Sequence, residues 1–274
     1  MSKELYPVGF RRTGADQALR PKVACHYLLE RMRIGGATTA YVVLRPGKWD
    51  IPGYLGDGSE LGVSLAYLIV HVPFGVPFTL NQAYPFVRDA HVLLGFPDIL
   101  LWPEDVYVTL LERLARGSAD AVLGLFPAAF PDREGVVEID DSGQIHGVFE
   151  KSGFTHLDYM WALAVWRPSF TEFLHQFVQD RLSELYQDAA PRDLPSNSTF
   201  KEIPIGDVLH EAIKAGLRVE GHRFVTGRYI DIGTPDQLMV ALRQEALQTP
   251  VLASAQDKEP LAAASNPPPP ADAR

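Results

Sequence analysis

Two aspartates stand where an α/β protein could use them to bind a metal ion. Asp98 follows the apolar segment 91–95, and Asp231 lies between Ile230 and Ile232. Since strand ends meet at the carboxyl edge of such a sheet, both carboxylates could hold one Mg²⁺ against the phosphates of a ligand. Asp98 can equally be a turn residue ahead of a helix, whereas Asp231 is costly among apolar neighbours unless it is paired or binds a metal.

Two lysines could add positive charge to such a site. Lys151 follows Glu150 at the end of an apolar segment, and Lys3 precedes Leu5 near the start of the chain. Each can be a solvated lysine without a role, and only the combination with the aspartates favours a function. No Ser/His/Asp, metal-histidine or phosphate-loop spacing stands out.

Composition excludes several classes of protein. The chain has 274 residues, 46% of them hydrophobic, which suits one or two globular domains. A net charge of −9 argues against general nucleic-acid binding. Cys25 is the only cysteine, so an intrachain disulfide is excluded and a reducing cytoplasm is expected. The sequence predicts neither a signal peptide nor a membrane span.

Apolar periodicity predicts strands alternating with helices. The expected strands are residues 39–45, 63–70, 91–95, 119–126, 135–140, 144–150, 159–166 and 217–225. The expected helices are residues 22–33, 104–116 and 207–215, with a fourth opened by Thr234. This order predicts an α/β fold with a Rossmann-like, doubly wound, mostly parallel sheet. The turn sequence at 140–143 adds a small antiparallel element.

The composition of the chain changes near residue 249. We expect one domain over residues 1–248 and a disordered Ala/Pro-rich tail over 249–274, because the tail has too little apolar surface to order itself. Residues 181–199 form a polar, proline-interrupted insertion, a candidate flap or oligomer contact.

Five short motifs in order resemble those of the sugar-1-phosphate nucleotidyltransferases, of the glucose-1-phosphate thymidylyltransferase and uridylyltransferase type. They cover most of the chain, from Ser2 to Arg243. The motifs are SKELYPV (2–8), LGDGS with a following glycine (55–62), GVVE (135–138), EK (150–151) and DIGT (231–234). The resemblance implies a nucleoside triphosphate and a sugar 1-phosphate as partners, Mg²⁺ as cofactor and pyrophosphate as a product. Little covalent help is needed, because metal and lysine charges hold the reacting groups in line.

The resemblance also implies roles for the charged residues. Asp98 and Asp231 match the two metal-binding aspartates. Lys3 resembles a lysine that contacts phosphate near the nucleotide loop, and Lys151 one that contacts the sugar phosphate. Phe96 and Pro97 intervene where the family runs directly from glycine to aspartate.

Three further positions resemble binding positions of the family. The backbone at Gly135 and the side chain of Glu202 match parts that hold sugar hydroxyls. Gly75 looks like the glycine that lets the base approach the backbone. Val70 stands where relatives often have a base-reading glutamine, so the sequence does not choose between thymine and uracil.

The family's Gly-rich nucleotide loop should lie just upstream of Ser2, and we expect the printed chain to be a fragment or to have a misassigned start. Such a loop supplies backbone N–H groups to phosphates. A non-catalytic nucleotide-sugar-binding or regulatory member of the same fold is therefore the main alternative. A glycosyltransferase ranks lower, because no Asp-x-Asp follows a strand. Homo-oligomerisation stays open.

Overall fold

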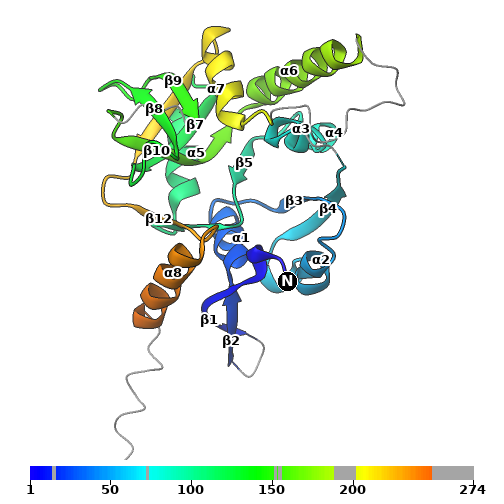
Figure 1. Ribbon diagram of the computed structural model, residues 1–274, viewed down its shortest axis with the longest axis vertical. Coiled ribbons are helices and arrows are strands. Elements are labelled where there is room, and N and C mark those ends of the chain that lie inside the picture. Colours follow the sequence, from blue (N-terminus) through cyan, green and yellow to red (C-terminus); the bar gives the residue numbers. More distant parts are fainter. Residues whose placement is uncertain (14–16, 72–73, 151–152, 154–155, 188–201, 249–274) are drawn as a thin grey trace, which may run out of the picture.

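The computed structural model describes residues 1–13, 17–71, 74–150, 153, 156–187 and 202–248, and shows a mixed α/β architecture (Figure 1). The strands are β1 (Pro7–Thr13), β2 (Ala18–Val23), β3 (Thr39–Leu44), β4 (Ser64–Ile69), β5 (Val92–Gly95), β6 (Ile99–Trp102), β7 (Ala121–Pro127), β8 (Gly135–Ile139), β9 (Ile145–Glu150), β10 (Tyr159–Trp166), β11 (Val219–Arg223) and β12 (Arg228–Asp231).

The α-helices are interspersed among the strands, and two short 3-10 helices flank the first part of the chain. The helices are η1 (Lys3–Leu5), α1 (Ala24–Ile34), α2 (Asp50–Leu55), η2 (Ser59–Leu61), α3 (Val76–Asn81), α4 (Tyr84–Val87), α5 (Val106–Arg116), α6 (Pro168–Gln187), α7 (Ile205–Lys214) and α8 (Pro235–Gln248).

The largest sheet has six strands in the order β11-β7-β10-β8-β9, with β5 also paired to β10. Strands β11 and β7 are parallel, whereas β10 runs antiparallel to β5, β7 and β8. Strands β3 and β4 form a separate parallel pair, and β6 and β12 an antiparallel pair. The predicted α/β class is confirmed. The strand pairings do not establish the doubly wound, mostly parallel order that was also predicted.

The core lies on both faces of β7 and β10. On one face, α6 and α7 contribute buried side chains such as Phe170, Leu174 and Leu209. On the other face, α1 and α5 contribute a second cluster. The helix predicted over residues 104–116 is confirmed as α5, and Val106, Leu110 and Leu114 on one side of it are buried.

The helix α1 is tied to β6 by a buried arginine. Arg31 is 1% exposed, and its Nε donates to the carbonyl oxygen of Leu101 at 2.8 Å. Its guanidinium also donates to the carbonyl of Tyr27 and lies 3.7 Å from a carboxylate oxygen of Glu104. A buried cation persists only with such partners, so these contacts fix the position of β6 relative to α1.

Most predicted elements occur within two residues of their expected bounds, and α8 begins as expected after Thr234, whose Oγ1 accepts from the backbone N–H of Gln237 at 3.3 Å. The sequence did not predict the β1–β2 hairpin, β6, the short helices α2, α3 and α4, or α6, and it placed a strand ahead of Asp231 without giving the bounds of β12. The predicted insertion 181–199 begins inside α6, and its residues 188–199 lie outside the described residues, as does the whole tail 249–274. In the described part of the chain, no helix combines the length and apolarity needed to cross a bilayer.

Candidate functional site

An ion pair joins Lys3, in η1, to Asp98, in the loop between β5 and β6. The Nζ of Lys3 lies 2.5 Å from Oδ2 of Asp98, and their side chains are 45% and 20% exposed. The hydrogen bond to Asp98 raises the pKa of Lys3, partial burial opposes this, and the charges of Asp98, Asp231 and Glu4 add to it. Lys3 is therefore fully charged at neutral pH.

Asp231 reaches the same place through the pairing of β12 with β6. This antiparallel register sets Asp231 opposite Ile99, and the backbone N–H of Ile232 donates to the carbonyl of Asp98 at 2.9 Å. The Oδ1 of Asp231 accepts from the N–H of Gly233 at 2.7 Å. The two aspartates thus come together, as predicted, but Asp98 precedes β6 and Asp231 ends β12. Antiparallel neighbours, rather than two parallel strand ends, create the convergence.

This arrangement suits a hard cation that also contacts a ligand. Mg²⁺ in proteins is bound through one or two carboxylates together with phosphate oxygens and waters. Asp98 and Asp231 could supply those carboxylates, and the described residues include no group of three or more His, Cys, Asp and Glu side chains that could hold a metal alone. The donor set therefore fits an ion shared with a phosphate ligand better than a closed metal site.

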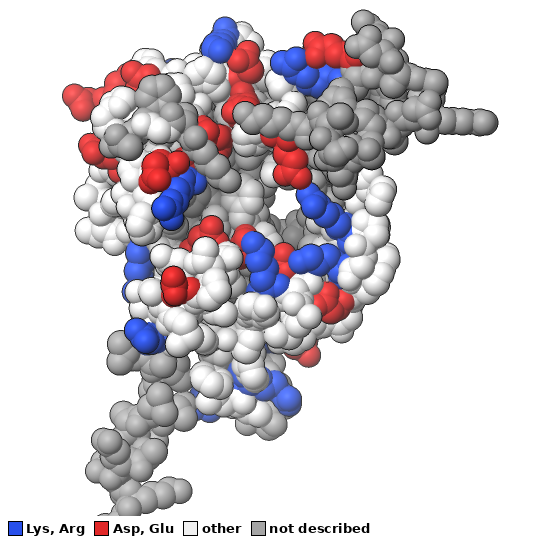
Figure 2. All heavy atoms as spheres, in the orientation of Figure 1, with Lys and Arg blue, Asp and Glu red and all other residues white. Residues whose placement is uncertain are grey.

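The loop that follows β3 contributes two cations that the sequence interpretation did not single out. Lys48 donates to both carboxylate oxygens of Glu4, at 3.2 and 3.0 Å, and Glu4 is the neighbour of Lys3. Arg45 lies 3.4 Å from Glu202. Both residues follow the carboxyl end of β3, which is a parallel strand. Because α/β proteins bind ligands at such strand ends, this position could have identified both residues from the sequence. Around a central hollow of the molecule, Figure 2 shows positive and negative side chains intermingled.

A second cluster surrounds Gly135. Gly135 pairs with Glu150 across β8 and β9, and Trp161 donates from Nε1 to Oε1 of Glu150 at 3.3 Å. A Cβ at Gly135 would lie 2.8 Å from both of those atoms, and one at Gly206 would clash with the Glu150 carboxylate. The two glycines therefore make room for a carboxylate at the end of β9. Lys151, the next residue, lies outside the described residues.

Phe96 links the two groups of residues. It lies in the β5–β6 loop with Asp98, and its ring contacts that of Trp161 edge-on, with centroids 5.9 Å apart. The N–H of Ile99 donates to the carbonyl of Phe96 at 3.0 Å, which closes the loop tightly. The insertion of Phe96 and Pro97, which seemed a departure from the family pattern, thus connects the aspartate site with the Gly135 cluster.

Gly75 and Glu202 lie together through Ile203. Gly75 forms a parallel bridge with Ile203, whose N–H donates to the carbonyl of Phe74 at 3.1 Å. Gly75 has φ +108° and ψ −176°, and an added Cβ would clash with the Ile203 backbone. The close approach of Ile203 thus explains why a glycine stands at position 75. Glu202 forms an ion pair with Arg45. The described contacts do not join this pair directly to Lys3, Asp98 or Asp231.

Fold and site together define a mixed α/β protein in which a lysine of η1 meets two aspartates, one in the β5–β6 loop and one at the end of β12. The chain matches no known protein-family model. It is 25% identical over 221 residues to the low-salt glycan biosynthesis nucleotidyltransferase Agl11 of Haloferax volcanii, covering 80% of this chain and 56% of that protein. It is 31% identical over 137 residues to a glucose-1-phosphate thymidylyltransferase of Streptomyces griseus, covering 47% of this chain and 36% of that protein.

Solved structures share the fold over most of the chain. A Bacillus anthracis protein assigned as a glucose-1-phosphate thymidylyltransferase, in complex with a sucrose, has a TM-score of 0.67 at 18% identity, and the match covers 89% of this chain and 86% of that one. A UDP-glucose pyrophosphorylase complexed with UDP-glucose has a TM-score of 0.66 at 14% identity and covers 90% and 91%.

These comparisons confirm the resemblance found in the sequence. The chain is similar in sequence to proteins named as sugar-phosphate nucleotidyltransferases, and these relatives are enzymes. It spans little more than half the length of the Haloferax protein.

Proposed function

We propose that the protein is a nucleotidyltransferase that joins a sugar 1-phosphate to a nucleoside triphosphate and releases pyrophosphate. The substrates proposed are glucose 1-phosphate and dTTP or UTP. The observation that carries the proposal is the convergence of Lys3, Asp98 and Asp231 in a fold shared with sugar-phosphate nucleotidyltransferases. In the proposed reaction, an oxygen of the sugar phosphate attacks the α-phosphorus, and the bond from that phosphorus to the pyrophosphate oxygen breaks.

The residues of the site would act by position and charge. Asp98 and Asp231 would hold Mg²⁺, which when bound neutralises phosphate charge and orients the triphosphate. Lys3, drawn from Asp98 to the ligand, would neutralise a further phosphate oxygen. The backbone of Gly135 would donate or accept hydrogen bonds with sugar hydroxyls, and the carboxylate of Glu202 would accept them. Lys151, which lies outside the described residues, would contact the sugar phosphate.

The test is pyrophosphate release with Mg²⁺, glucose 1-phosphate and either dTTP or UTP. It should be run on the printed chain and on the chain extended upstream by the genomic reading frame. Asp231→Asn should lower turnover by about 100-fold or more in whichever chain is active, because it removes a charge that acts mainly in the transition state. Its melting temperature should stay close to that of the unmutated protein.

Asp89→Asn is the matched control. Asp89 is exposed and pairs only weakly with its neighbour Arg88 at 3.3 Å, so turnover should not change. Full activity of Asp231→Asn would remove Asp231 from the site. If both chains fold and neither turns over with these or other nucleotide and sugar pairs, the non-catalytic binding or regulatory function is supported instead.

A further inference from the structure

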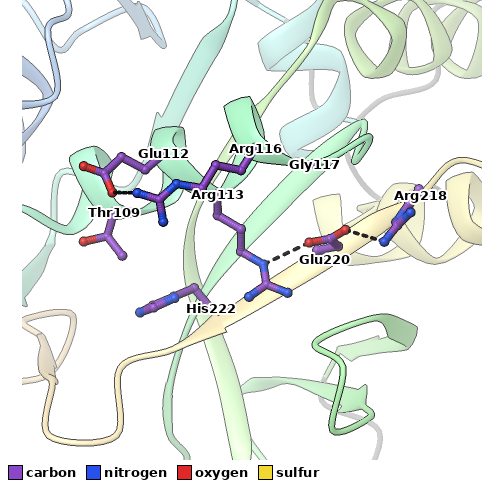
Figure 3. Close-up of a pocket in the computed structure, with 8 residues that line it drawn as sticks. All are labelled: Thr109, Glu112, Arg113, Arg116, Gly117, Arg218, Glu220 and His222. Atoms are coloured by element: carbon purple, nitrogen blue, oxygen red, sulfur yellow. Dashed lines mark hydrogen bonds and ion pairs between the residues drawn. The ribbon is translucent and has the colours of Figure 1, made fainter.

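A charged pocket of about 430 Å³ lies where the end of α5 meets β11, and its lining includes none of the candidate site residues (Figure 3). Arg113, Arg116 and Arg218 line it together with two glutamates and a histidine. Since β11 forms the edge of the six-stranded sheet, this pocket belongs to the surface of the main sheet.

A buried glutamate holds two of the arginines in place. Glu220 is 6% exposed, and its carboxylate lies 2.9 Å from Nε of Arg113 and 2.9 Å from Nη2 of Arg218 (Figure 3). Arg113 also donates to the carbonyl of Ser142, and Arg218 to the hydroxyl of Ser118. Each of the two guanidinium groups is therefore held by two partners, which lowers the entropic cost of binding a ligand.

The third arginine is held much more loosely. Arg116 is 79% exposed, and its guanidinium contacts Glu112 one helical turn earlier at 2.8 Å. Exposed pairs of this kind contribute little to stability, because water screens them and side-chain entropy opposes them. Arg116 can therefore turn towards a ligand in the pocket without disturbing the Glu220 network.

The balance of charge in the pocket is opposite to that of the chain. Three arginines face two glutamates in the lining, whereas the chain has a net charge of −9. Burial lowers the pKa of His222, and the charge of Arg113 lowers it further, so this histidine adds a neutral hydrogen-bonding group. The net negative charge of the chain repels anions, so an anion would bind only where hydrogen-bond donors and positive charges are concentrated locally, as they are in this pocket.

We propose that this pocket is a binding site for a small phosphate-class oxyanion, either inorganic phosphate or the phosphate group of a small monoester. Arg113 and Arg218 would present fixed N–H donors, and Arg116 would close over the anion from the mouth. Planar guanidinium groups bind phosphate oxygens through paired hydrogen bonds, which suits this geometry. The proposal is independent of the proposed catalytic function.

The test is a titration of the ¹⁵N-labelled protein followed by amide chemical shifts. Inorganic phosphate and glycerol 3-phosphate are added separately at constant ionic strength, with sodium chloride as the reference titration. The amides of Gly117 and Arg218 should shift saturably with phosphate and not with chloride. The tighter of the two phosphate ligands then identifies the free or the esterified form as the preferred source.

Two variants locate the binding. Arg116→Gln leaves the Glu220 network intact and should raise the half-saturation concentration at Gly117 about tenfold. Arg88→Gln, which changes an exposed arginine paired with Asp89, should leave it unchanged. Non-saturating shifts at Gly117, shifts equal to those caused by chloride, or identical half-saturation in Arg116→Gln would each overturn the proposal. Shifts confined to the surroundings of Lys3 would do the same.

Discussion

Lys3 and a bound Mg²⁺ would compete for the carboxylate of Asp98, because Lys3 is paired with that carboxylate in the structure. Because the pKa of Lys3 is raised in the folded protein, the stability that its ion pair contributes is fully present below the ordinary lysine pKa. It is lost only as the pH rises through the higher folded value. At neutral pH the charged Lys3 is therefore paired with Asp98. If Mg²⁺ binds to the carboxylate of Asp98 instead, Lys3 needs a new partner, which a phosphate oxygen of the ligand would provide.

His26 should make stability fall in mild acid. Its side chain is buried at 2% exposure, and its Nδ1 has no hydrogen-bond partner in the described part of the chain. Burial, helped by the charges of Arg11 and Lys22, lowers its pKa to about 4. The unfolded chain takes up a proton near pH 6.5 and the folded chain only near pH 4, so stability is lost between these values as the pH falls.

The expected loss between pH 7 and pH 4 is about 3 kcal/mol from this residue. Urea unfolding at several pH values measures it, with His26→Gln as the comparison, because the variant keeps all other titrating groups. The stability of the variant should depend on pH less steeply by that amount. Equal slopes for the two proteins would show that His26 takes up its proton equally in both states.

At the scale of the elements, Gly75 joins the start of α3 to the strand-like segment before α7. Glycine adopts its φ of +108° readily, whereas other residues are strained there. A Cβ at this position would also clash with the backbone of Ile203. Gly75→Ala should therefore destabilise the protein by about 2–4 kcal/mol, the sum of backbone strain and a clash that a rigid backbone cannot avoid.

Gly216→Ala is the matched control for this prediction. Gly216 follows α7 with φ +93°, and a Cβ there would have no neighbour within 4 Å. It should cost only about 1 kcal/mol, from strain alone. Chemical denaturation of both variants measures the difference, and equal losses would mean that the approach of Ile203 to Gly75 does not constrain the fold.

The sequence was informative about elements with a clear apolar period and uninformative about elements defined by their partners. Strand β10 was predicted with its observed bounds, because its apolar side chains are buried on both faces of the sheet. Strands β6 and β12 have only four residues each, and they form strands because they pair with each other. This tertiary pairing, which no local period encodes, is also what brings Asp98 to Asp231.

The same contrast applies to the site. Lys3 and the two aspartates were predicted from residue type and position, and the structure brings them together. Arg45 and Lys48 were missed because their partners, Glu202 and Glu4, are far away in sequence. Gly75 was assigned to base binding, a role that remains a prediction beside its packing against Ile203.

At the scale of the whole molecule, Cys25 can report how ligand binding stabilises the fold. The thiol is 4% exposed in a cluster that also contains Leu5 and Leu29, and burial raises its pKa to about 12. It should therefore react with a thiol reagent only when the protein opens. Leu5 ends η1, the short helix that carries Lys3, so opening of this cluster separates Lys3 from the site.

A nucleotide that binds at Lys3 should consequently slow the labelling of Cys25. With Mg²⁺ and UTP or dTTP at about 100 times the dissociation constant, the folded state gains about 2.7 kcal/mol, which corresponds to labelling about 100-fold slower when reclosing is fast. In Lys3→Met the same nucleotide concentration should protect far less. Because labelling requires no turnover, strong protection without pyrophosphate release would identify a binding protein, whereas protection by neither nucleotide would argue against a nucleotide site at Lys3.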